Sequence, residues 1–184
     1  MKKIVALLLT IALVVSMSAV AFAVPSKSTS DMTKVKTVTA KNGATVASNF
    51  AVEIAKDTPE TIAALADIAA KIADGSATLE AFGTDVKAEV EALLPAGTDV
   101  SKLNLNEFVT IKTANYDKAY GAMSVSFTVA SSYVDGQSVV ALVMVKGKWV
   151  AVPAVVQNGE IVIDFPEDIL EAINGQDVAL AIFG

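Results

Sequence analysis

The chain of 184 residues is long enough for one ordinary domain or two small ones, and its 53% of apolar residues suffices for a hydrophobic core. It has a formal net charge of −6 and contains no cysteine, no histidine and no arginine. These absences exclude disulfides, the usual zinc sites, Ser-His-Asp triads, cysteine nucleophiles and bidentate arginine clamps. An acidic chain is also a poor candidate for binding nucleic acid or anionic lipid.

The first 23 residues have the pattern of a secretory signal peptide. Lys2 and Lys3 precede the apolar run 4–15, and Ala21-Phe22-Ala23 is a small-x-small cleavage signature. We predict cleavage after Ala23 and a secreted, extracellular product that no longer contacts the membrane. That product has 12 lysines and 20 acidic residues, a net charge of −8. An uncleaved membrane anchor is the alternative, because the apolar stretch approaches spanning length.

Residues 24–33 are small and polar, which predicts a disordered leader. Residues 34–97 are predicted to form a small α/β subdomain. It begins with two apolar runs, 34–40 and 50–55, that suit strands and could pair as a hairpin.

The clearest helix signal covers residues 59–74. Thr58 is placed as the N-cap, Pro59 as the first helical residue and Gly75 as the stop. The apolar spacing predicts one buried face, which comprises Ile62, Leu65, Ile68, Ala69 and Ile72.

A second amphipathic helix is predicted over residues 85–94, with Thr84 as its cap and Val86, Val90, Leu93 and Leu94 on one face. The two helices are joined by a compact linker. We therefore expect them to pack against each other as an antiparallel pair.

Residues 98–184 are predicted to form an antiparallel β-sandwich with one short helix, so that the whole chain belongs to the α+β class. Residues 122–130 alternate between apolar and hydroxyl side chains, whereas 139–145 are apolar on both faces and predict a central strand. Asn158-Gly159 is the dipeptide of a tight hairpin turn. We expect about six strands, at 107–113, 122–130, 138–145, 149–156, 161–165 and 178–183, and a helix at 166–173.

Residues 107–165 combine the alternating strand with Tyr133-x-Asp135-Gly136, Gly147-x-Trp149, Asn158-Gly159 and Phe165. This pattern resembles the C-terminal immunoglobulin-like β-sandwich modules of small exported proteins from Gram-positive, clostridia-like bacteria. The resemblance covers about a third of the chain and implies a fold and an extracellular location. Its motifs are structural, so it implies no catalytic residue.

Few catalytic arrangements are open to this composition. The chain has no Walker lysine motif, no Gly-x-Gly-x-x-Gly turn and no EF-hand loop, so we expect no cofactor and no metal. A looser calcium site at the loop acids Asp135 or Asp117 stays open. The candidates for a glycosidase acid pair are Asp164, Glu167, Asp168 and Glu171. We favour a structural role for these acids, because two of them lie at a helix N-terminus, where negative charge stabilises the helix.

Aromatic side chains are the best candidates for a ligand surface. Trp149 could stack on a sugar ring or a partner's apolar group, although we favour a core position between sheets. Tyr116, Tyr120 and Tyr133 flank the alternating strand and would form an aromatic rim if their loops meet at one end. Equally, they could be corner tyrosines whose hydroxyls tie loops to the backbone.

Together these features predict an exported, non-enzymatic binding module whose partner is a cell-surface glycan or a protein. The alternative is a structural or assembly component, in which the strands at 35–38 and 178–183 pair as edges between chains. An acid-pair glycoside hydrolase is a third, weaker hypothesis. The oligomeric state is open at this point.

Overall fold

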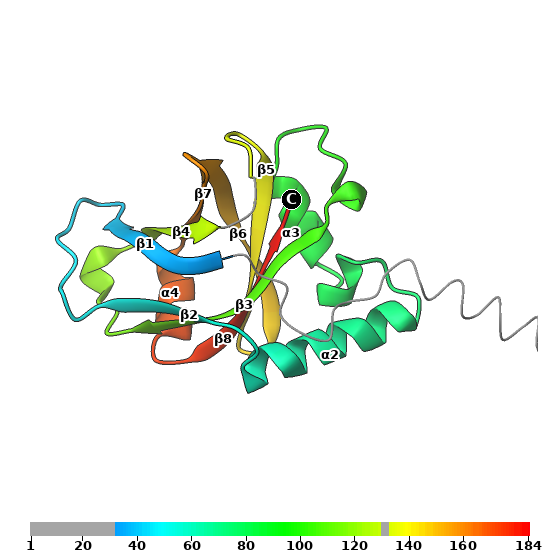
Figure 1. The fold of residues 1–184 in the computed structure, drawn as a ribbon, viewed down its shortest axis with the longest axis horizontal. Helices are drawn as coiled ribbons and strands as arrows, with labels where there is room; N and C mark the ends of the chain where they lie inside the picture. The colour runs from blue at the N-terminus through cyan, green and yellow to red at the C-terminus, as the bar shows by residue number, and fades with distance from the viewer. Residues whose placement is uncertain (1–31, 130–132) are drawn as a thin grey trace, which may run out of the picture.

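The computed structural model describes residues 32–129 and 133–184 (Figure 1). Eight strands form a single antiparallel sheet, and the described residues contain three α-helices. The predicted α+β class is therefore confirmed. The predicted signal peptide and residues 24–31 of the predicted leader lie outside the described residues, but Met32 and Thr33 belong to the first strand.

The elements follow the chain from β1 to β8. The strands are β1 (Met32–Ala40), β2 (Ala51–Ala55), β3 (Leu105–Ala114), β4 (Met123–Val129), β5 (Ser138–Val145), β6 (Lys148–Gln157), β7 (Glu160–Phe165) and β8 (Asp177–Phe183). The helices are α2 (Pro59–Ala73), α3 (Val86–Leu93) and α4 (Glu167–Ile173). Short 3-10 helices are η1 (Glu80–Phe82), η2 (Val100–Lys102) and η3 (Lys118–Tyr120).

The strand order in the sheet is β1-β4-β7-β6-β5-β8-β3-β2. The sheet curls so that its edge strands, β1 and β2, approach each other without pairing (Figure 1). The predicted hairpin between these two strands is wrong, because β1 pairs with β4 and β2 pairs with β3. Residues 34–97 and 98–184 thus contribute strands to the same sheet, with β3 to β8 coming from the second segment.

The strand predicted at residues 178–183 is present, but the alternative in which it pairs with a strand of another chain requires an edge position that it does not have. This strand, β8, lies inside the sheet between β5 and β3. Its sequence is apolar on both faces, which suits a strand that has a neighbour on each side and a covering layer above and below.

Two hydrophobic cores lie on opposite faces of the sheet. The inner core fills the curl of the sheet and includes α4, and the outer core lies between the sheet and α2, η1 and α3. Alternate residues of β5 point to the two cores: Val139, Ala141 and Val143 are in the inner core, and Val140 and Leu142 are in the outer one. The predicted central strand is confirmed. β8 is divided between the two cores in the same way.

Helix α2 begins and ends where the sequence predicts. The Thr58 hydroxyl accepts a hydrogen bond from the Thr61 amide at 3.3 Å, and Gly75 follows the helix with a positive φ of 98°. The predicted buried face is partly wrong: Ile62 is 48% exposed, and Thr61 is buried in its place. Thr61 is compatible with burial because its hydroxyl donates to the Thr58 carbonyl.

Helix α3 starts at Val86 with Asp85 as its N-cap residue, so the predicted Thr84 cap is wrong. The predicted antiparallel helix pair is replaced by a different arrangement. α2 packs on β8 and β3, α3 packs on β6, and η1 contacts both helices (Figure 1). Each helix covers apolar side chains of the sheet, and Phe82 of η1 is buried in the outer core between them.

Two-residue turns join β6 to its neighbours in sequence. Asn158 and Gly159 both have positive φ values, 53° and 70°, as the predicted tight hairpin turn requires. Lys146 and Gly147 make the equivalent turn between β5 and β6, with φ values of 49° and 80°. The middle of the sheet is therefore a tight meander of β5, β6 and β7.

Candidate functional site

Trp149, the first predicted ligand residue, lies in the outer core and is only 6% exposed. Its ring packs edge to face against Phe82, at a centroid distance of 4.9 Å, and against Phe108 at 5.8 Å. The structure therefore favours the core interpretation. A buried ring in this position cannot stack on a sugar without opening the helical layer.

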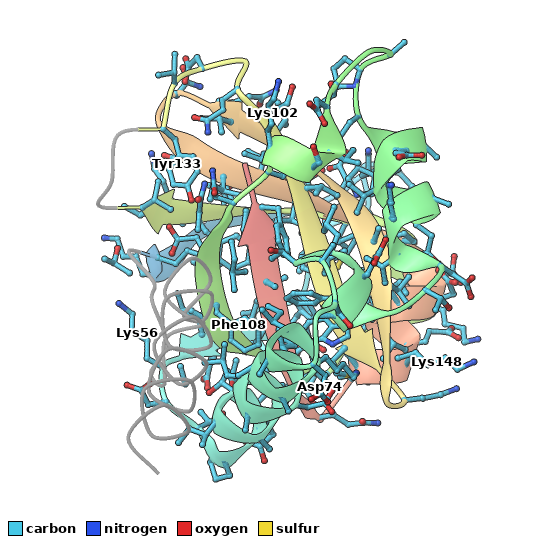
Figure 2. The ribbon with its side chains drawn as sticks, turned by 90° about the vertical axis from the view of Figure 1, so that its right-hand side faces the viewer. Lys56, Asp74, Lys102, Phe108, Tyr133 and Lys148 are labelled. Atoms are coloured by element: carbon cyan, nitrogen blue, oxygen red, sulfur yellow. The ribbon has the colours of Figure 1, made fainter. Side chains whose placement is uncertain are left out.

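The three tyrosines do not form one rim. Tyr116 follows the end of β3 and Tyr120 precedes β4, whereas Tyr133 follows the far end of β4. Tyr133 lies toward the end of the molecule that carries Lys102, at the top of Figure 2. The prediction of a shared rim is wrong for Tyr133, because strand β4 separates it from the other two.

The alternative role, hydroxyls that tie loops to the backbone, is confirmed for two of the tyrosines. The Tyr116 hydroxyl donates to the Gly121 carbonyl at 2.7 Å, and the Tyr120 hydroxyl accepts from the Ala47 amide at 3.2 Å. The Tyr133 hydroxyl instead donates to a side chain, the carboxylate of Glu107, at 3.0 Å.

A compact aromatic cluster occupies the end of the sheet where Tyr116 and Tyr120 lie. Phe50, which precedes β2, joins the two tyrosines, and the three ring centroids are 6.0–6.3 Å apart with interplanar angles of 66–76°. Phe50 and Tyr116 are half-buried and Tyr120 is buried. We call this region, with the loops 41–50 and 115–122 that build it, the tyrosine end.

Asparagine side chains fix the loops of the tyrosine end. The Asn42 amide donates to the Ala119 carbonyl at 2.9 Å, and the Asn115 amide donates to the Asn49 carbonyl at 2.8 Å. The Asn174 side chain, at the end of α4, accepts from the Tyr116 backbone amide at 3.1 Å. Three chain segments that are far apart in sequence are thereby held in one arrangement.

The tyrosine end carries charges of both signs. Lys118 forms an ion pair with Glu171 of α4, which raises the pKa of the lysine. Burial, together with the nearby carboxylates of Glu167, Glu171 and Asp117, raises the pKa of the Tyr116 phenol. Tyr116 is therefore neutral at physiological pH and can act as a hydrogen-bond donor.

The four acids of the hypothetical glycosidase pair have separate environments. Asp164 bonds with Lys41 and Ser124, Glu171 pairs with Lys118, and the other two are exposed on the first turn of α4. Glu167 and Asp168 lie where negative charge stabilises a helix.

The loop acids proposed for calcium each accept a backbone hydrogen bond. Asp135 accepts from the Gly159 amide at 2.9 Å, and Asp117 accepts from the Ala119 amide at 2.9 Å. Within residues 32–129 and 133–184, no three acidic side chains are grouped so that they could hold a metal ion. In the same part of the chain, no helix has the length and apolarity to cross a membrane.

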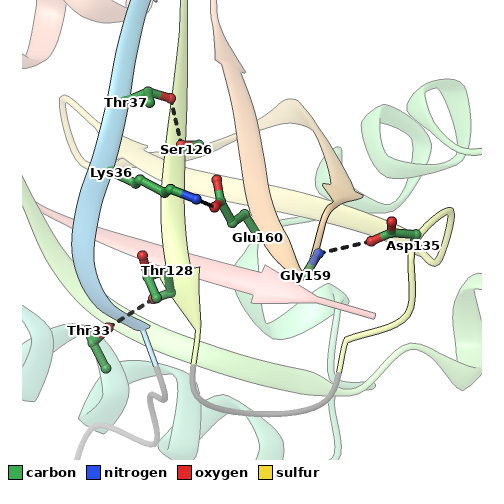
Figure 3. Close-up of polar contacts among 8 residues, drawn as sticks. All are labelled: Thr33, Lys36, Thr37, Ser126, Thr128, Asp135, Gly159 and Glu160. Carbon is green, nitrogen blue, oxygen red and sulfur yellow. Dashed lines mark hydrogen bonds and ion pairs between the residues drawn. The ribbon is translucent and has the colours of Figure 1, made fainter.

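The outer surface of β1, β4 and β7 is a second polar region, which we call the polar face (Figure 3). Thr37 and Ser126 share a hydrogen bond of 2.7 Å between their hydroxyls, and the Thr33 hydroxyl donates to the Thr128 carbonyl at 3.3 Å. Two ion pairs, Lys36 with Glu160 and Lys41 with Asp164, reach from the β1 side across β4 to β7. The small serines of β4 leave room for these long side chains.

The carboxyl pKa values on the polar face predict acid sensitivity. Burial opposes ionisation of Asp164, but hydrogen bonds from Lys41 and Ser124 outweigh it and hold the pKa below its usual value. The pKa of Glu160 is also lowered, chiefly by the hydrogen bond from Lys36. Both groups therefore stabilise the fold above the usual pKa of a carboxyl, and this stabilisation is lost as the pH falls through the lowered values.

We expect the free energy of unfolding to fall between about pH 5 and pH 2, and to fall less steeply in Asp164→Asn. Urea denaturation followed by far-UV circular dichroism at a series of pH values measures this. An identical pH dependence in the variant and the wild type would show that Asp164 is not involved.

Glu107 is the main polar residue that the sequence analysis missed. It is 1% exposed, and its carboxylate accepts hydrogen bonds from the Met32 amide at 3.2 Å and from the Tyr133 hydroxyl. A signal was present in the sequence. Glu107 lies two and four residues before Val109 and Ile111 on β3, so its side chain points to the same face of the sheet as these two residues of the inner core. Alternation along the strand therefore places the carboxylate on the core face.

The fold and its surfaces define an α+β protein built on one curled antiparallel sheet, with an aromatic and amide-rich end and a separate polar face. Comparison of the chain with models of known protein families, with curated proteins and with solved structures found no match.

Proposed function

We propose that the protein is an exported, extracellular binding module without enzymatic activity, and that the tyrosine end is its ligand surface. A cell-surface glycan is the ligand that fits this surface best, with a protein partner as the other candidate. The proposal agrees with the signal-peptide pattern and with the resemblance to exported proteins of Gram-positive bacteria.

The observation that carries the proposal is the combination of half-buried rings with fixed amides at one end of the sheet. Phe50 and Tyr116 supply apolar ring surface, and the exposed side chains of Asn42, Asn115 and Asn174 are fixed on the backbone of the same end. Sugars present flat C–H surfaces and hydroxyl groups, which rings and amides complement. Because hydrogen bonds already hold the loops, little conformational entropy would be lost on binding.

Within the α+β class, we propose a sandwich-like description of the sheet. β4 and β7 lie on one side of the inner core and β3 and β8 on the other, with Phe127 and Ile163 from the first pair and Ile111 and Leu180 from the second. In a sandwich, loops cluster at the two ends, and one end commonly carries the binding site.

Calorimetric titration of the secreted form with cell-wall polysaccharide and with mucin glycans tests the proposed function. Lys118→Ala is the informative variant, because Lys118 is exposed at the tyrosine end and its ammonium group, with three donor hydrogens, can bond to a ligand as well as to Glu171. Lys118 is not one of the three rings of the cluster. Lys102→Ala is the matched control: it also removes an exposed lysine that pairs with a nearby acid, but at the opposite end of β3 (Figure 2).

We expect binding of a glycan that weakens by about tenfold in Lys118→Ala and is unchanged in Lys102→Ala, as the loss of one charged hydrogen bond predicts. Equal weakening in both variants would show that the charge of the protein, and not the tyrosine end, governs binding. Absence of heat with every glycan would overturn the glycan ligand and leave a protein partner as the candidate.

A further inference from the structure

Strand β1 joins the sheet with an irregular register. It is an edge strand, its described partner is β4, and its register with β4 is interrupted twice, between Met32 and Lys34 and between Val35 and Thr37. The opposite edge strand, β2, pairs with β3 without interruption. Interrupted pairing lowers the number of regular backbone hydrogen bonds that hold a strand in place.

The side chains of β1 compensate with a specific set of contacts. Met32 and Ala40 are buried at the two ends of the strand, and Val35 and Val38 pack partly against the inner core. On the outer side, Lys36 pairs with Glu160 of β7 and Thr37 bonds with Ser126 of β4. The docking site on β4 and β7 is therefore complementary in shape and charge to the sequence of β1 itself.

The connection from β1 to the rest of the fold is long. Residues 41–50 join it to β2, the strand at the opposite edge of the sheet. Lys41 and Asn42 stay with β1, because the Lys41 amide donates to the Ala122 carbonyl and the Asn42 side chain donates to the Ala119 carbonyl, both next to β4. The second part of the loop is held at the tyrosine end through Ala47, Asn49 and Phe50, so residues 43–46 are the hinge segment. Four extended residues span about 13 Å.

The contacts of β1 join segments that are far apart in the sequence. Thr37 and Ser126 are 89 positions apart, so closing this pairing requires a large loop and depends on β4 and β7 being in place. While its own β1 is undocked, the site on β4 and β7 can bind β1 of another copy of the chain. Such an exchange of identical elements is domain swapping.

From these observations we propose that β1 is an exchangeable strand, and that its docking site on β4 and β7 is an interaction surface for β1 of a second copy of this chain. In the exchanged dimer, each β1, together with Lys41 and Asn42, makes the same contacts as in the monomer, including the hydrogen bond from the Met32 amide to Glu107, and residues 43–46 are extended between the two copies. The hinge segment lies in a loop of the tyrosine end, but the exchange requires no ligand there. It differs from simple edge pairing, because no new strand pairing is created.

The absence of native cysteine makes the exchange directly measurable. Thr37 and Ser126 are direct register partners with hydroxyls 2.7 Å apart, and Cα atoms of such partners are about 4.5–5.5 Å apart, within the range for a disulfide. Thr37→Cys and Ser126→Cys are made as separate single variants, co-refolded in equal amounts and oxidised. A disulfide between positions 37 and 126 can then form only between two chains.

The double variant T37C/S126C shows whether the disulfide geometry is attainable. A matched control is the pair of single variants Lys112→Cys and Asp177→Cys, whose positions are also register partners but on β3 and β8, in the interior of the sheet order. Peptide mass spectrometry identifies the linked positions, and light scattering gives the mass of the wild type over a range of concentrations.

We expect the 37–126 interchain disulfide at several times the yield of the 112–177 control, and a wild-type mass that rises toward a dimer with concentration. A double variant that crosslinks within one chain, combined with no interchain 37–126 product and a constant monomer mass, would overturn the proposal. Equal yields for the two pairs would overturn it too, because they would indicate random collision.

Discussion

Replacing Trp149 with alanine is expected to lower the free energy of unfolding by about 3–5 kcal/mol, the range for truncating a large aromatic side chain in a core. Trp149 is 6% exposed, and its ring contacts Phe82 of η1 and Phe108 of β3. It is therefore one of the side chains through which the meander of β5, β6 and β7 contacts the helical layer. Removing it leaves a cavity between rings that cannot move toward each other without shifting η1.

Urea denaturation followed by far-UV circular dichroism measures this change, because the variant has no tryptophan fluorescence. Val134→Ala is a suitable control, since Val134 is 68% exposed and its truncation should change stability by less than about 0.5 kcal/mol. In the wild type, the same burial predicts a blue-shifted tryptophan emission. A red-shifted band, or a variant as stable as Val134→Ala, would contradict a core position for Trp149.

Replacing Glu107 with alanine is expected to lower the free energy of unfolding by about 2–4 kcal/mol. The change removes the acceptor for the Met32 amide and for the Tyr133 hydroxyl, and a buried donor without an acceptor costs about 1–3 kcal/mol. These two bonds connect the start of β1 and the segment before β5 to the core face of β3.

Two milder variants distinguish a hydrogen-bonding role from a packing role. Tyr133→Phe removes one donor and should lower stability by about 1 kcal/mol, and Glu107→Gln retains the shape with a single acceptor oxygen. We expect the order of stability to be wild type, then these two variants, then Glu107→Ala. If Glu107→Gln were as stable as the wild type, hydrogen bonding to the second oxygen would contribute nothing.

Features that depend on a few adjacent residues could be predicted from the sequence. The capping of α2 by Thr58, its stop at Gly75 and the turn at Asn158 and Gly159 follow from local backbone preferences. The two-sided burial of β5 follows from its unbroken apolar run. None of these depends on knowing which distant segment lies next to them.

Strand partners could not be predicted in this way. β1 and β2 are adjacent in sequence and have similar apolar runs, but they pair with β4 and β3 because the curled sheet places them at its two edges. Likewise, Ile62 satisfies the helical period, but the orientation of α2 on β8 and β3 buries Thr61 instead. Such outcomes depend on the packing of whole elements, which a local pattern does not specify.

The candidate site was predicted only in part for the same reason. Tyr116 and Tyr120 do lie together, because both belong to the short segment, containing η3, that connects the end of β3 to the start of β4. Phe50 was not expected there, since it reaches the cluster through the pairing of β2 with β3. Tyr133 was assigned to the wrong end because the length of β4 separates it from Tyr120.

The division of β5 and β8 between two cores has a consequence for cooperativity. Alternate side chains of both strands belong to opposite cores, so detaching α2 and α3 would leave Val140, Leu142 and Phe183 facing water on strands that also hold the interior together. Neither the helical layer with the outer core nor the inner core can therefore unfold independently of the other. The described domain should behave as a single thermodynamic unit, in which the amide protons of β5 exchange with solvent only when the whole structure opens.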